Sequence, residues 1–434
     1  MREMKDSGIE WIGKIPLNWI CSKQKYALSL LNGRAFSDTE FLGEGKYRVL
    51  RVGNIFTNPV WYYSNLKLDD SKYCDKGDLL YTWSMSYAPV IWTGEKVIYH
   101  YHIWKVLPRK FINKRFAFYY LQALTLALKS EIHETTMGFI TMGIMNNAYI
   151  AYGSLKEQQA IANFLDDKCA DIDSLTGDIQ KQIDILNEYK KSVITQAVTK
   201  GIDPNVEMKD SGIAWIGKIP KNWEIKKIKN VICNDKDGLK IGPFGSALAN
   251  KTIADGAYNI YGQANLVNDD FSYTKNTINK NTFHILKSYQ VLPNDICLSM
   301  MGTIGKCKTV PVGIKEGIMD SHLIKIRLDK TQIISKFFEY VYDKDRSNIC
   351  ITEMQYVKKG SIMDGLNTSI VKNLRIVVPL ISDQQAIVDF LDAKCADIDA
   401  AIAGKQKQLD VLKEYKKSLI YEYVTGKKEV PCRE

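Results

Sequence analysis

Residues 5–19 read KDSGIEWIGKIPLNW, and residues 209–223 read KDSGIAWIGKIPKNW. Thirteen of the fifteen positions are identical, at an offset of 204 residues. Similar segments at a fixed separation are the signature of a duplicated structural unit. The phrase predicts that the chain contains two copies of one fold.

A second repeat follows each copy of the phrase. Residues 157–173 read EQQAIANFLDDKCADID and residues 383–399 read DQQAIVDFLDAKCADID, with thirteen of seventeen positions identical at an offset of 226. Weaker echoes have intermediate offsets: YRVLRVGNI from Tyr47 and YNIYGQANL from Tyr258 differ by 211, and HIWKV from His102 and HLIKI from His322 by 220. A rising offset predicts that scattered loop insertions lengthened the second copy. The C-terminus stops about where the N-terminal phrase begins, which predicts neighbouring ends and a near-cyclic, pseudo-twofold organisation.

Composition sets broader bounds. A chain of 434 residues with 45% hydrophobic residues is long enough for two to three domains. The net charge of +10 fits a nucleic-acid partner, although many enzymes share such an excess. The N-terminus MREMKDSGIEW lacks the apolar run of a signal peptide, and no stretch of 18 apolar residues could span a membrane. Nine cysteines without a C-x-x-C pair lead us to expect free thiols in a reducing cytoplasm.

The segment after each Gln-Gln motif predicts a long helix. Apolar residues recur every seven positions, with Gln, Lys, Asp and Glu between them, and this spacing is typical of a coiled-coil seam. Leu175 and Tyr189 lie three positions further on in their heptads, and Cys169 and Ile183 four positions further on. Two such helices related by pseudo-twofold symmetry would pair antiparallel, as a spacer alone or as a spacer and a docking surface. The predicted seam comprises Leu165, Ile172, Ile179, Leu186, Leu391, Ile398, Leu412 and Leu419.

The fold class that we expect is α+β. The blocks at about 20–156 and 224–382 contain short β-rich runs such as DLLYTWS and SHLIKIRL, separated by Gly, Asn, Pro and Asp. The repeated phrase, rich in Trp, Ile, Pro and Gly, reads as a structural clamp where the chain leaves a helix for the following domain. The predicted architecture is two α+β domains joined by two long antiparallel coiled-coil helices.

Both blocks carry aromatic, basic and hydrogen-bonding residues within polar loops. Such groups suit the reading of base edges and the binding of phosphates, and they also suit an ordinary protein interface. The candidate DNA-contacting residues of the first block are Arg51, Tyr62, Trp83, Ser84, Tyr87 and His102. Those of the second block are Lys240, Phe244, Ser246, Gln263, Asn265, Thr303 and His322.

The sequence contains no complete catalytic or metal-binding motif. No adenine-methyltransferase tetrad of the NPPY or DPPY type is present, and GTIGKC at 302–307 lacks the spacing and the Lys-Ser/Thr pair of a P-loop. The carboxylate–lysine runs at 163–168 and 389–394 imitate a nuclease set but fall on predicted helices. His100 and His102 could share a metal, but no third ligand is evident. We therefore predict no catalytic residue and no metal site.

The arrangement resembles the specificity subunit of type I restriction–modification systems over nearly the whole chain. The resemblance rests on the two phrases, on EQQAIANFLD and DQQAIVDFLD, on IGPFGSAL at 241–248, on GTIGK at 302–306 and on VVPLISDQQ at 377–385. One departure is YGSLKEQQ at 152–159, where the family usually has a proline, and it puts the local turn in doubt.

The resemblance implies a non-catalytic DNA specificity subunit. Two target-recognition domains, residues 1–156 and 208–382, would each read half of an asymmetric bipartite site on double-stranded DNA. The conserved helical segments, residues 157–207 and 383–434, would set the gap between the halves and dock two methyltransferase subunits; restriction subunits can join them. The partners, and not this chain, would bind S-adenosylmethionine, ATP and Mg²⁺. A stand-alone DNA-binding regulator and a coiled-coil adaptor are the alternatives.

Overall fold

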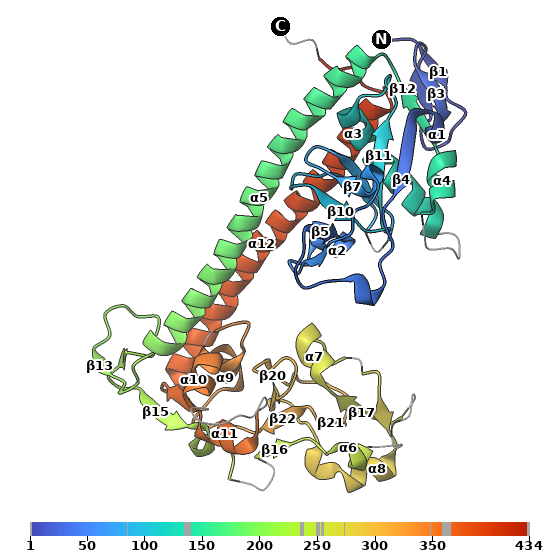
Figure 1. Cartoon of the computed structure of the whole chain (residues 1–434). Helices are drawn as coiled ribbons and strands as arrows, with labels where there is room; N and C mark the ends of the chain where they lie inside the picture. Colours follow the sequence, from blue (N-terminus) through green and yellow to red (C-terminus); the bar gives the residue numbers. More distant parts are fainter. Residues whose placement is uncertain are drawn as a thin grey trace. The chain divides into compact units, whose positions relative to one another are not determined.

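The structure is a computed structural model that describes residues 2–84, 86–133, 140–234, 238–248, 252, 256–272, 274–347, 349–357 and 366–431. The chain divides into two compact units. Unit 1 comprises residues 1–180 and 407–434, and unit 2 comprises residues 181–406. Each unit combines a mixed α+β domain with part of two long helices, α5 (Leu155–Lys200) and α12 (Ile381–Val424), as Figure 1 shows.

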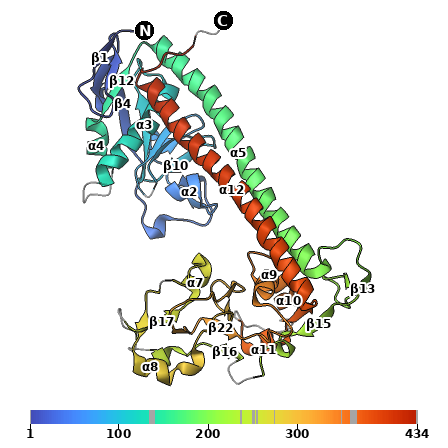
Figure 2. The same ribbon diagram turned by 180° about the vertical axis from the view of Figure 1, so that it is seen from behind.

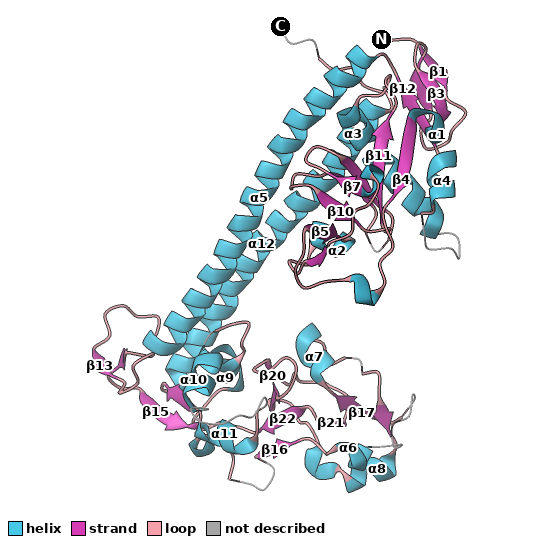
Figure 3. Cartoon of the chain, viewed as in Figure 1, coloured by secondary structure: helices cyan, strands magenta, loops and turns pink. Residues whose placement is uncertain are grey.

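Unit 1 is built on two four-stranded sheets (Figure 3). The first has the antiparallel order β4-β11-β8-β9, and the second has the order β6-β5-β10-β7 with β5 and β10 parallel. Two-stranded sheets join β1 to β2 and β3 to β12. The strands are β1 (Met4–Asp6), β2 (Lys14–Pro16), β3 (Ile20–Lys23), β4 (Leu28–Asn32), β5 (Tyr47–Leu50), β6 (Tyr62–Ser64), β7 (Tyr73–Cys74), β8 (Leu79–Thr82), β9 (Ala88–Ile91), β10 (Val97–Tyr99), β11 (Ile103–Pro108) and β12 (Tyr149–Tyr152). Besides the long helices, the helices are α1 (Gln24–Ala27), α2 (Val52–Phe56), α3 (Lys114–His133) and α4 (Met142–Asn147).

Unit 2 repeats this topology. Its antiparallel sheet β16-β22-β19-β20 corresponds to β4-β11-β8-β9, and its parallel pair β17–β21 corresponds to β5–β10. The strands are β13 (Met208–Asp210), β14 (Lys218–Pro220), β15 (Glu224–Lys227), β16 (Leu239–Ile241), β17 (Tyr258–Tyr261), β18 (Thr277–Ile278), β19 (Ile296–Ser299), β20 (Cys307–Thr309), β21 (Gly317–Met319), β22 (Leu323–Ile326) and β23 (Arg375–Val378). The helices are α6 (Gly245–Leu248), α7 (Gln263–Asn268), α8 (Lys280–Ile285), α9 (Ser335–Tyr342), α10 (Ile349–Val357) and α11 (Thr368–Asn373).

Within each unit, a stretch of α5 runs antiparallel to a stretch of α12 (Figures 1 and 2). In unit 1, Lys416 of α12 pairs with Asp173 of α5, and in unit 2, Lys190 of α5 pairs with Asp399 of α12. Of the eight predicted seam residues, Leu186 and Leu412 are half-buried and the other six are buried. Among the described residues, no helix is long and apolar enough to cross a membrane.

The other apolar residues of the predicted heptads, which lie three or four positions after a seam residue, differ in how far they are buried. Cys169 and Ile183, four positions after a seam residue, are buried, whereas Leu175 and Tyr189, three positions after one, are about half exposed. An α-helix has 3.6 residues per turn, so an apolar stripe can follow the i, i+4 positions and leave the i+3 positions at its edge.

The repeated phrase packs on the end of a long helix. In unit 1, Trp19 and Ile15 are buried against the last turns of α12, and in unit 2, Trp223 and Ile219 are buried against the last turns of α5. The Lys427 ammonium donates to the Ile12 carbonyl at 2.6 Å, so the C-terminal segment lies on the N-terminal phrase. The predicted clamp and the predicted neighbouring ends are both confirmed.

The Gln-Gln motif joins each long helix to its α+β domain. Gln158 and Gln384, the first glutamine of each motif, are fully buried. The Gln158 amide donates to the Phe111 and Gly153 carbonyls at 3.0 and 2.9 Å, and the Gln384 amide donates to the Gln332 and Pro379 carbonyls at 2.8 and 2.9 Å. Since an unpaired buried amide is costly, these bonds explain why both copies keep this glutamine.

The turn that departs from the family pattern is satisfied locally. Ser154 precedes α5, its hydroxyl accepts a hydrogen bond from the Glu157 backbone nitrogen at 3.3 Å, and its own nitrogen donates to the Glu157 carboxylate at 2.9 Å. This reciprocal pair is a capping box, which supplies a helix start without a proline.

Candidate nucleic-acid interface

Four turns of unit 1 meet at one end of its sheets, and we call them turn cluster 1. They are residues 33–36 after β4, 51–54 at the start of α2, 83–84 after β8, and 100–102 between β10 and β11. Backbone bonds join them: the His100 nitrogen donates to the Leu50 carbonyl at 2.9 Å, and the Trp83 nitrogen to the His102 carbonyl at 3.2 Å. A Cβ atom at Gly33 would overlap the His100 carbonyl, so only glycine fits at this close approach.

Four turns of unit 2 meet in the same way and form turn cluster 2. They are residues 242–244, 262–265, 300–304 and 320–322. The Asp320 nitrogen donates to the Tyr261 carbonyl at 2.8 Å, and the Met300 nitrogen to the His322 carbonyl at 3.1 Å. Gly242 approaches the Asp320 carbonyl as Gly33 approaches that of His100. The two clusters therefore share one backbone scaffold.

Aromatic rings line turn cluster 1 in a continuous series. The ring centroids of Phe41 and Tyr62 lie 5.0 Å apart, those of His100 and His102 4.8 Å apart, and those of His102 and Trp83 5.3 Å apart. Phe41 also lies 6.3 Å from His100, which closes the series. His100 is buried, and the other four rings are half-buried, so these four offer faces and edges on which bases or sugars can pack.

Two arginines lie over these rings. The Arg51 guanidinium lies 4.2 Å from the Tyr62 ring centroid, and the Arg34 guanidinium lies 4.7 Å from the Phe36 ring centroid. Arg34 is also paired with Glu40, whereas the Arg51 guanidinium donates to the Val60 carbonyl at 3.4 Å. A guanidinium held over a ring is pre-organised for guanine or phosphate, because its donor fork is fixed before binding.

The two histidines of turn cluster 1 are held neutral. Burial, together with the nearby His102 and Arg51, lowers the pKa of His100 to about 4, and burial lowers the pKa of His102. A neutral imidazole has one donor and one acceptor nitrogen, so these rings can recognise polar groups without carrying charge at pH 7.

Polar side chains line turn cluster 2 instead. The Gln263 amide nitrogen donates to the Ser299 hydroxyl at 3.0 Å and to the Met301 carbonyl, and the Ser299 and Thr303 hydroxyls lie 3.0 Å apart. The Asp320 carboxylate accepts from the His322 nitrogen at 2.8 Å, and burial raises its pKa. The shared scaffold thus carries rings and arginines in one unit, and amides, hydroxyls and a carboxylate in the other.

The structure distributes the predicted residues of the first block unevenly. Arg51, Trp83 and His102 lie in turn cluster 1, and Tyr62 of β6 lies beside it under the Arg51 guanidinium. Ser84 belongs to the turn after β8 and accepts from the Ser86 nitrogen at 2.7 Å through its carbonyl. Tyr87 is half-buried, and the Lys129 ammonium lies 5.7 Å from its ring.

In the second block, Gln263, Thr303 and His322 lie in turn cluster 2, and Phe244 is 75% exposed in the loop after β16. Asn265 is buried and caps α7: its carbonyl oxygen accepts from the Gly262 nitrogen at 2.9 Å, and its amide donates to the Asp270 carbonyl at 2.8 Å. Lys240 lies 4.7 Å from the Tyr289 ring. The side chain of Ser246 lies outside the described part of the chain.

As DNA contacts, sequence reasoning missed several residues in or beside the clusters, namely Arg34, Phe36, Phe41, His100 and Tyr101 in unit 1 and Ser299 and Asp320 in unit 2; it considered His100 only as a metal ligand. Alignment of the two copies through His102 and His322 would have found His100 and Asp320, because both lie two residues earlier. Phe36 and Phe41 carry no such signal, because their loop has no close counterpart in the second copy.

The chemistry-like motifs have structural roles. In the first carboxylate–lysine run, the Asp166 carboxylate pairs with Arg115 and accepts from the Tyr119 hydroxyl at 2.7 Å; both partners belong to α3. In the second run, the Asp392 carboxylate accepts from the Tyr340 hydroxyl of α9. Lys306 of GTIGKC pairs with Asp345 at 2.7 Å. Over the described residues, no group of three or more His, Cys, Asp or Glu side chains could hold a metal ion.

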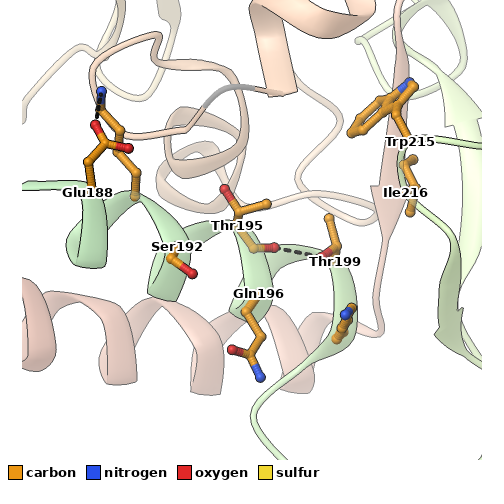
Figure 4. Close-up of a pocket in the computed structure, with 9 residues that line it drawn as sticks. Glu188, Ser192, Thr195, Gln196, Thr199, Trp215 and Ile216 are labelled. Atoms are coloured by element: carbon orange, nitrogen blue, oxygen red, sulfur yellow. Dashed lines mark hydrogen bonds and ion pairs between the residues drawn. The ribbon is translucent and has the colours of Figure 1, made fainter.

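A polar groove of about 470 Å³ lies along the last turns of α5 in unit 2 (Figure 4). Glu188, Ser192 and Gln196 line it from the helix, with Trp215 and Ile216 of the repeated phrase opposite. In unit 1, the position of Thr195 is taken by Tyr421, whose hydroxyl donates to the Trp11 carbonyl at 2.9 Å. In unit 1 this larger side chain therefore links the last turns of α12 to the repeated phrase.

Comparison with known proteins agrees with this architecture. The family described as type I restriction modification DNA specificity domain matches residues 18–184 and 220–411. The type I restriction enzyme MjaVIII specificity subunit of Methanocaldococcus jannaschii is 28% identical over 369 residues, which cover 81% of this chain and 79% of that protein. The EcoBI specificity subunit of Escherichia coli is 22% identical over 401 residues, which cover 89% and 81%.

A solved structure supports the fold. One chain of a type I restriction–modification system, studied for its complex assembly and conformational transition, superposes with a TM-score of 0.67 at 10% identity, over 94% of this chain and 98% of that chain. With two matched domains on two copies of one scaffold, the chain belongs to the type I restriction–modification DNA specificity family.

Proposed function

We propose that the chain recognises a bipartite site on double-stranded DNA, with turn cluster 1 reading one half-site and turn cluster 2 the other. The observation that carries the proposal is the contrast between the clusters and the helices. The clusters share their backbone hydrogen bonds but carry different side chains, whereas the helices keep thirteen of seventeen positions identical at residues 157–173 and 383–399 and share EYKKS at 188–192 and 414–418. Different side chains on one scaffold suit different base sequences, and equal helices suit one partner that binds twice.

The proposed partner of the helices is a methyltransferase subunit, bound in two copies. Exposed apolar residues recur at equivalent positions: Ile185 and Tyr189 of α5 in unit 2 are 67% and 47% exposed, and Val411 and Tyr415 of α12 in unit 1 are 60% and 54% exposed. In each patch the residue before the tyrosine is a glutamate that pairs with a lysine three positions later, Glu188 with Lys191 and Glu414 with Lys417. Two patches with the same apolar and charged pattern suit two copies of one partner surface.

The reaction chemistry is assigned to those partners. S-adenosylmethionine would belong to the methyltransferase subunits, and ATP and Mg²⁺ to restriction subunits where these join. This chain would contribute sequence recognition and spacing, in the cytoplasm where the DNA is found. The structural contacts of Asp166, Asp392 and Lys306, which occupy the nuclease-like and P-loop-like motifs, support this division.

The experiment is a DNA selection with the chain bound to its cognate methyltransferase. Random double-stranded DNA is retained by the complex and sequenced, for the wild type and for Arg51→Ala. The wild type should select two defined half-sites with a fixed gap, and Arg51→Ala should relax one half-site alone. A matched control is Arg48→Ala, because Arg48 lies over Trp61 outside turn cluster 1. Selection of no defined sequence by the wild-type complex would overturn the proposal.

A further inference from the structure

The position of His100 in turn cluster 1 is occupied by Asp320 in turn cluster 2. The correspondence rests on backbone bonds: both nitrogens donate to the last residue of the neighbouring parallel strand, Leu50 or Tyr261, and both carbonyls face a glycine, Gly33 or Gly242. A neutral imidazole in one unit is therefore replaced by a carboxylate in the other, at the same point of the same scaffold.

A neighbouring residue also differs between the two clusters. The start of α2 carries Arg51, and the equivalent start of α7 carries Gly262; each nitrogen donates to the capping asparagine, Asn54 or Asn265. A Cβ atom at Gly262 would overlap Oδ2 of Asp320. Gly262 therefore leaves room for the Asp320 carboxylate. At the two equivalent positions, unit 1 has the Arg51 guanidinium and the His100 imidazole.

Asp320 is an acceptor with remaining capacity. Its Oδ1 accepts from the His322 nitrogen at 2.8 Å, and its Oδ2 lies 3.6 Å from Nδ1 of His322. A carboxylate has about four lone-pair sites, so it can accept further hydrogen bonds. The side chain is 26% exposed, so it can be reached from the surface of turn cluster 2. The neighbouring Gln263 amide nitrogen is already bonded to Ser299 and Met301.

We propose that Asp320 determines specificity in unit 2 by accepting a hydrogen bond from the N4 amino group of a cytosine in the major groove. Cytosine presents a donor there, which a carboxylate accepts. Adenine also presents an amino group, but its N7 acceptor lies beside it and repels a carboxylate. The inference rests on the proposed function, because it assumes that turn cluster 2 faces DNA.

The test compares wild type and Asp320→Asn in the DNA selection with the methyltransferase complex. The wild type should require a cytosine at one position of the unit 2 half-site. Asparagine offers a donor and an acceptor and pairs well with adenine N6 and N7. Asp320→Asn should therefore reduce the preference for cytosine at that position about tenfold, raise that for adenine and leave the other half-site unchanged. Glu207→Gln, which removes a carboxylate from the exposed pair with Lys221, is the matched control.

A second measurement alters the DNA, and its wild-type arm does not depend on the folding of a variant. Each cytosine of the unit 2 half-site is replaced in turn by 2-pyrimidinone, which lacks the N4 amino group. One replacement should weaken binding about tenfold for the wild type, and the same replacement should have little effect on Asp320→Asn. Equal losses in both proteins, or an unchanged base preference in Asp320→Asn, would overturn the role of Asp320. Failure of the wild type to select any sequence would instead overturn the proposed function.

Discussion

The ammonium nitrogen of Lys416 lies 2.6 Å from Oδ1 of Asp173, which joins α12 to α5 in unit 1. The pair has a counterpart in unit 2, where Lys190 lies 2.6 Å from Oδ2 of Asp399. Each residue of one pair is 226 positions from its equivalent in the other, so the duplication preserved the contact as well as the sequence. Each pair ties a copy of the repeated helix to the other copy in antiparallel register.

Charge reversal tests this contact. The aspartates are mostly exposed, so Lys416→Ala should cost less than ~1 kcal/mol in the free energy of unfolding, as exposed ion pairs do. Asp173→Lys places like charges together and should cost about 1 kcal/mol more than Asp173→Ala. The double variant Asp173→Lys with Lys416→Asp should recover most of that loss. Urea denaturation measures these four variants and the single variant Lys416→Asp. Strict additivity of Asp173→Lys and Lys416→Asp in the double variant would show that the residues are not coupled.

Truncation of Trp19 should destabilise unit 1 severely. The side chain is 1% exposed, and its indole nitrogen donates to the Glu157 carboxylate at 3.4 Å. Trp19→Ala leaves a large cavity and should cost ~3–5 kcal/mol, whereas Leu17→Ala at an exposed position of the same phrase should cost little. Thermal unfolding followed by calorimetry should show a transition shifted to lower temperature. An unchanged profile for Trp19→Ala would contradict the clamp.

The buried imidazole of His100 predicts a pH dependence of stability. Its pKa is lowered to about 4 in the folded chain, so between pH 6.5 and pH 4 the unfolded chain binds a proton that the folded chain does not. The contribution is therefore zero above pH 6.5 and becomes destabilising as the pH falls, up to ~3 kcal/mol near pH 4. His100→Gln should flatten the difference between unfolding free energies at pH 7 and pH 5. His322→Gln, at an exposed position, is the control, and equal pH profiles for wild type and His100→Gln would refute the prediction.

Insertion of one heptad into each long helix tests their role as a spacer. In both copies the acidic residue before Gln-Gln, Glu157 or Asp383, is 31 positions before the glutamate of EYKKS, Glu188 or Glu414, while the recognition blocks differ by 22 residues. Seven residues added after Gln180 and seven after Gln406 preserve the seam and lengthen each helix by ~10 Å, or about three base pairs of DNA. The selected half-sites should keep their sequences with a gap about three base pairs longer. An active complex with the original gap would leave the helices as a docking surface alone.

The repeated apolar patches predict the stoichiometry of the partner. Val411→Asp with Tyr415→Ser should remove one of two methyltransferase subunits, because a charge in the centre of an apolar contact is costly to bury. The equivalent change, Ile185→Asp with Tyr189→Ser, should remove the other, and the combined variant should bind none. Mass measurement of the purified complex by light scattering counts the subunits. Loss of both subunits from either change alone would show that the sites are not independent.

A substitution in the groove of unit 2, Thr195→Tyr, should stabilise that unit. Thr195 lines the groove, and its equivalent in unit 1 is Tyr421, whose hydroxyl donates to the Trp11 carbonyl. Thr195→Tyr therefore gives unit 2 the residue that unit 1 already has at this position. The added ring should bury apolar area against Trp215 and raise the unfolding free energy of unit 2 by about 1 kcal/mol. Ala400→Tyr, at an exposed position of α12 in unit 2 that does not line the groove, is the control for added hydrophobicity. A decrease for Thr195→Tyr would show that the groove is too narrow for the ring.

Local patterns in the sequence were sufficient for the helices and the clamp. The Gln-Gln motifs predicted helices from residues 157 and 383, and α5 and α12 begin at Leu155 and Ile381. The seven-residue spacing indicated the seam, but it placed Leu175 and Tyr189 in the same heptads, and the structure leaves both about half exposed. Spacing describes which residues share a side of a helix, and the partner surface decides how wide the buried stripe becomes.

The amino-acid sequence by itself determined the duplication, the two α+β domains and the pairing of the helices. These features follow from near-identical segments and short-range periodicity, which act within a few turns of chain. Only the tertiary structure decided which side chains meet in the turn clusters, because those contacts depend on strand pairing between distant residues, such as Tyr99 with Leu50 and Met319 with Tyr261. His100 and Asp320 became visible as one position in two copies only when those pairings, and the glycines that permit the close approach, were in place.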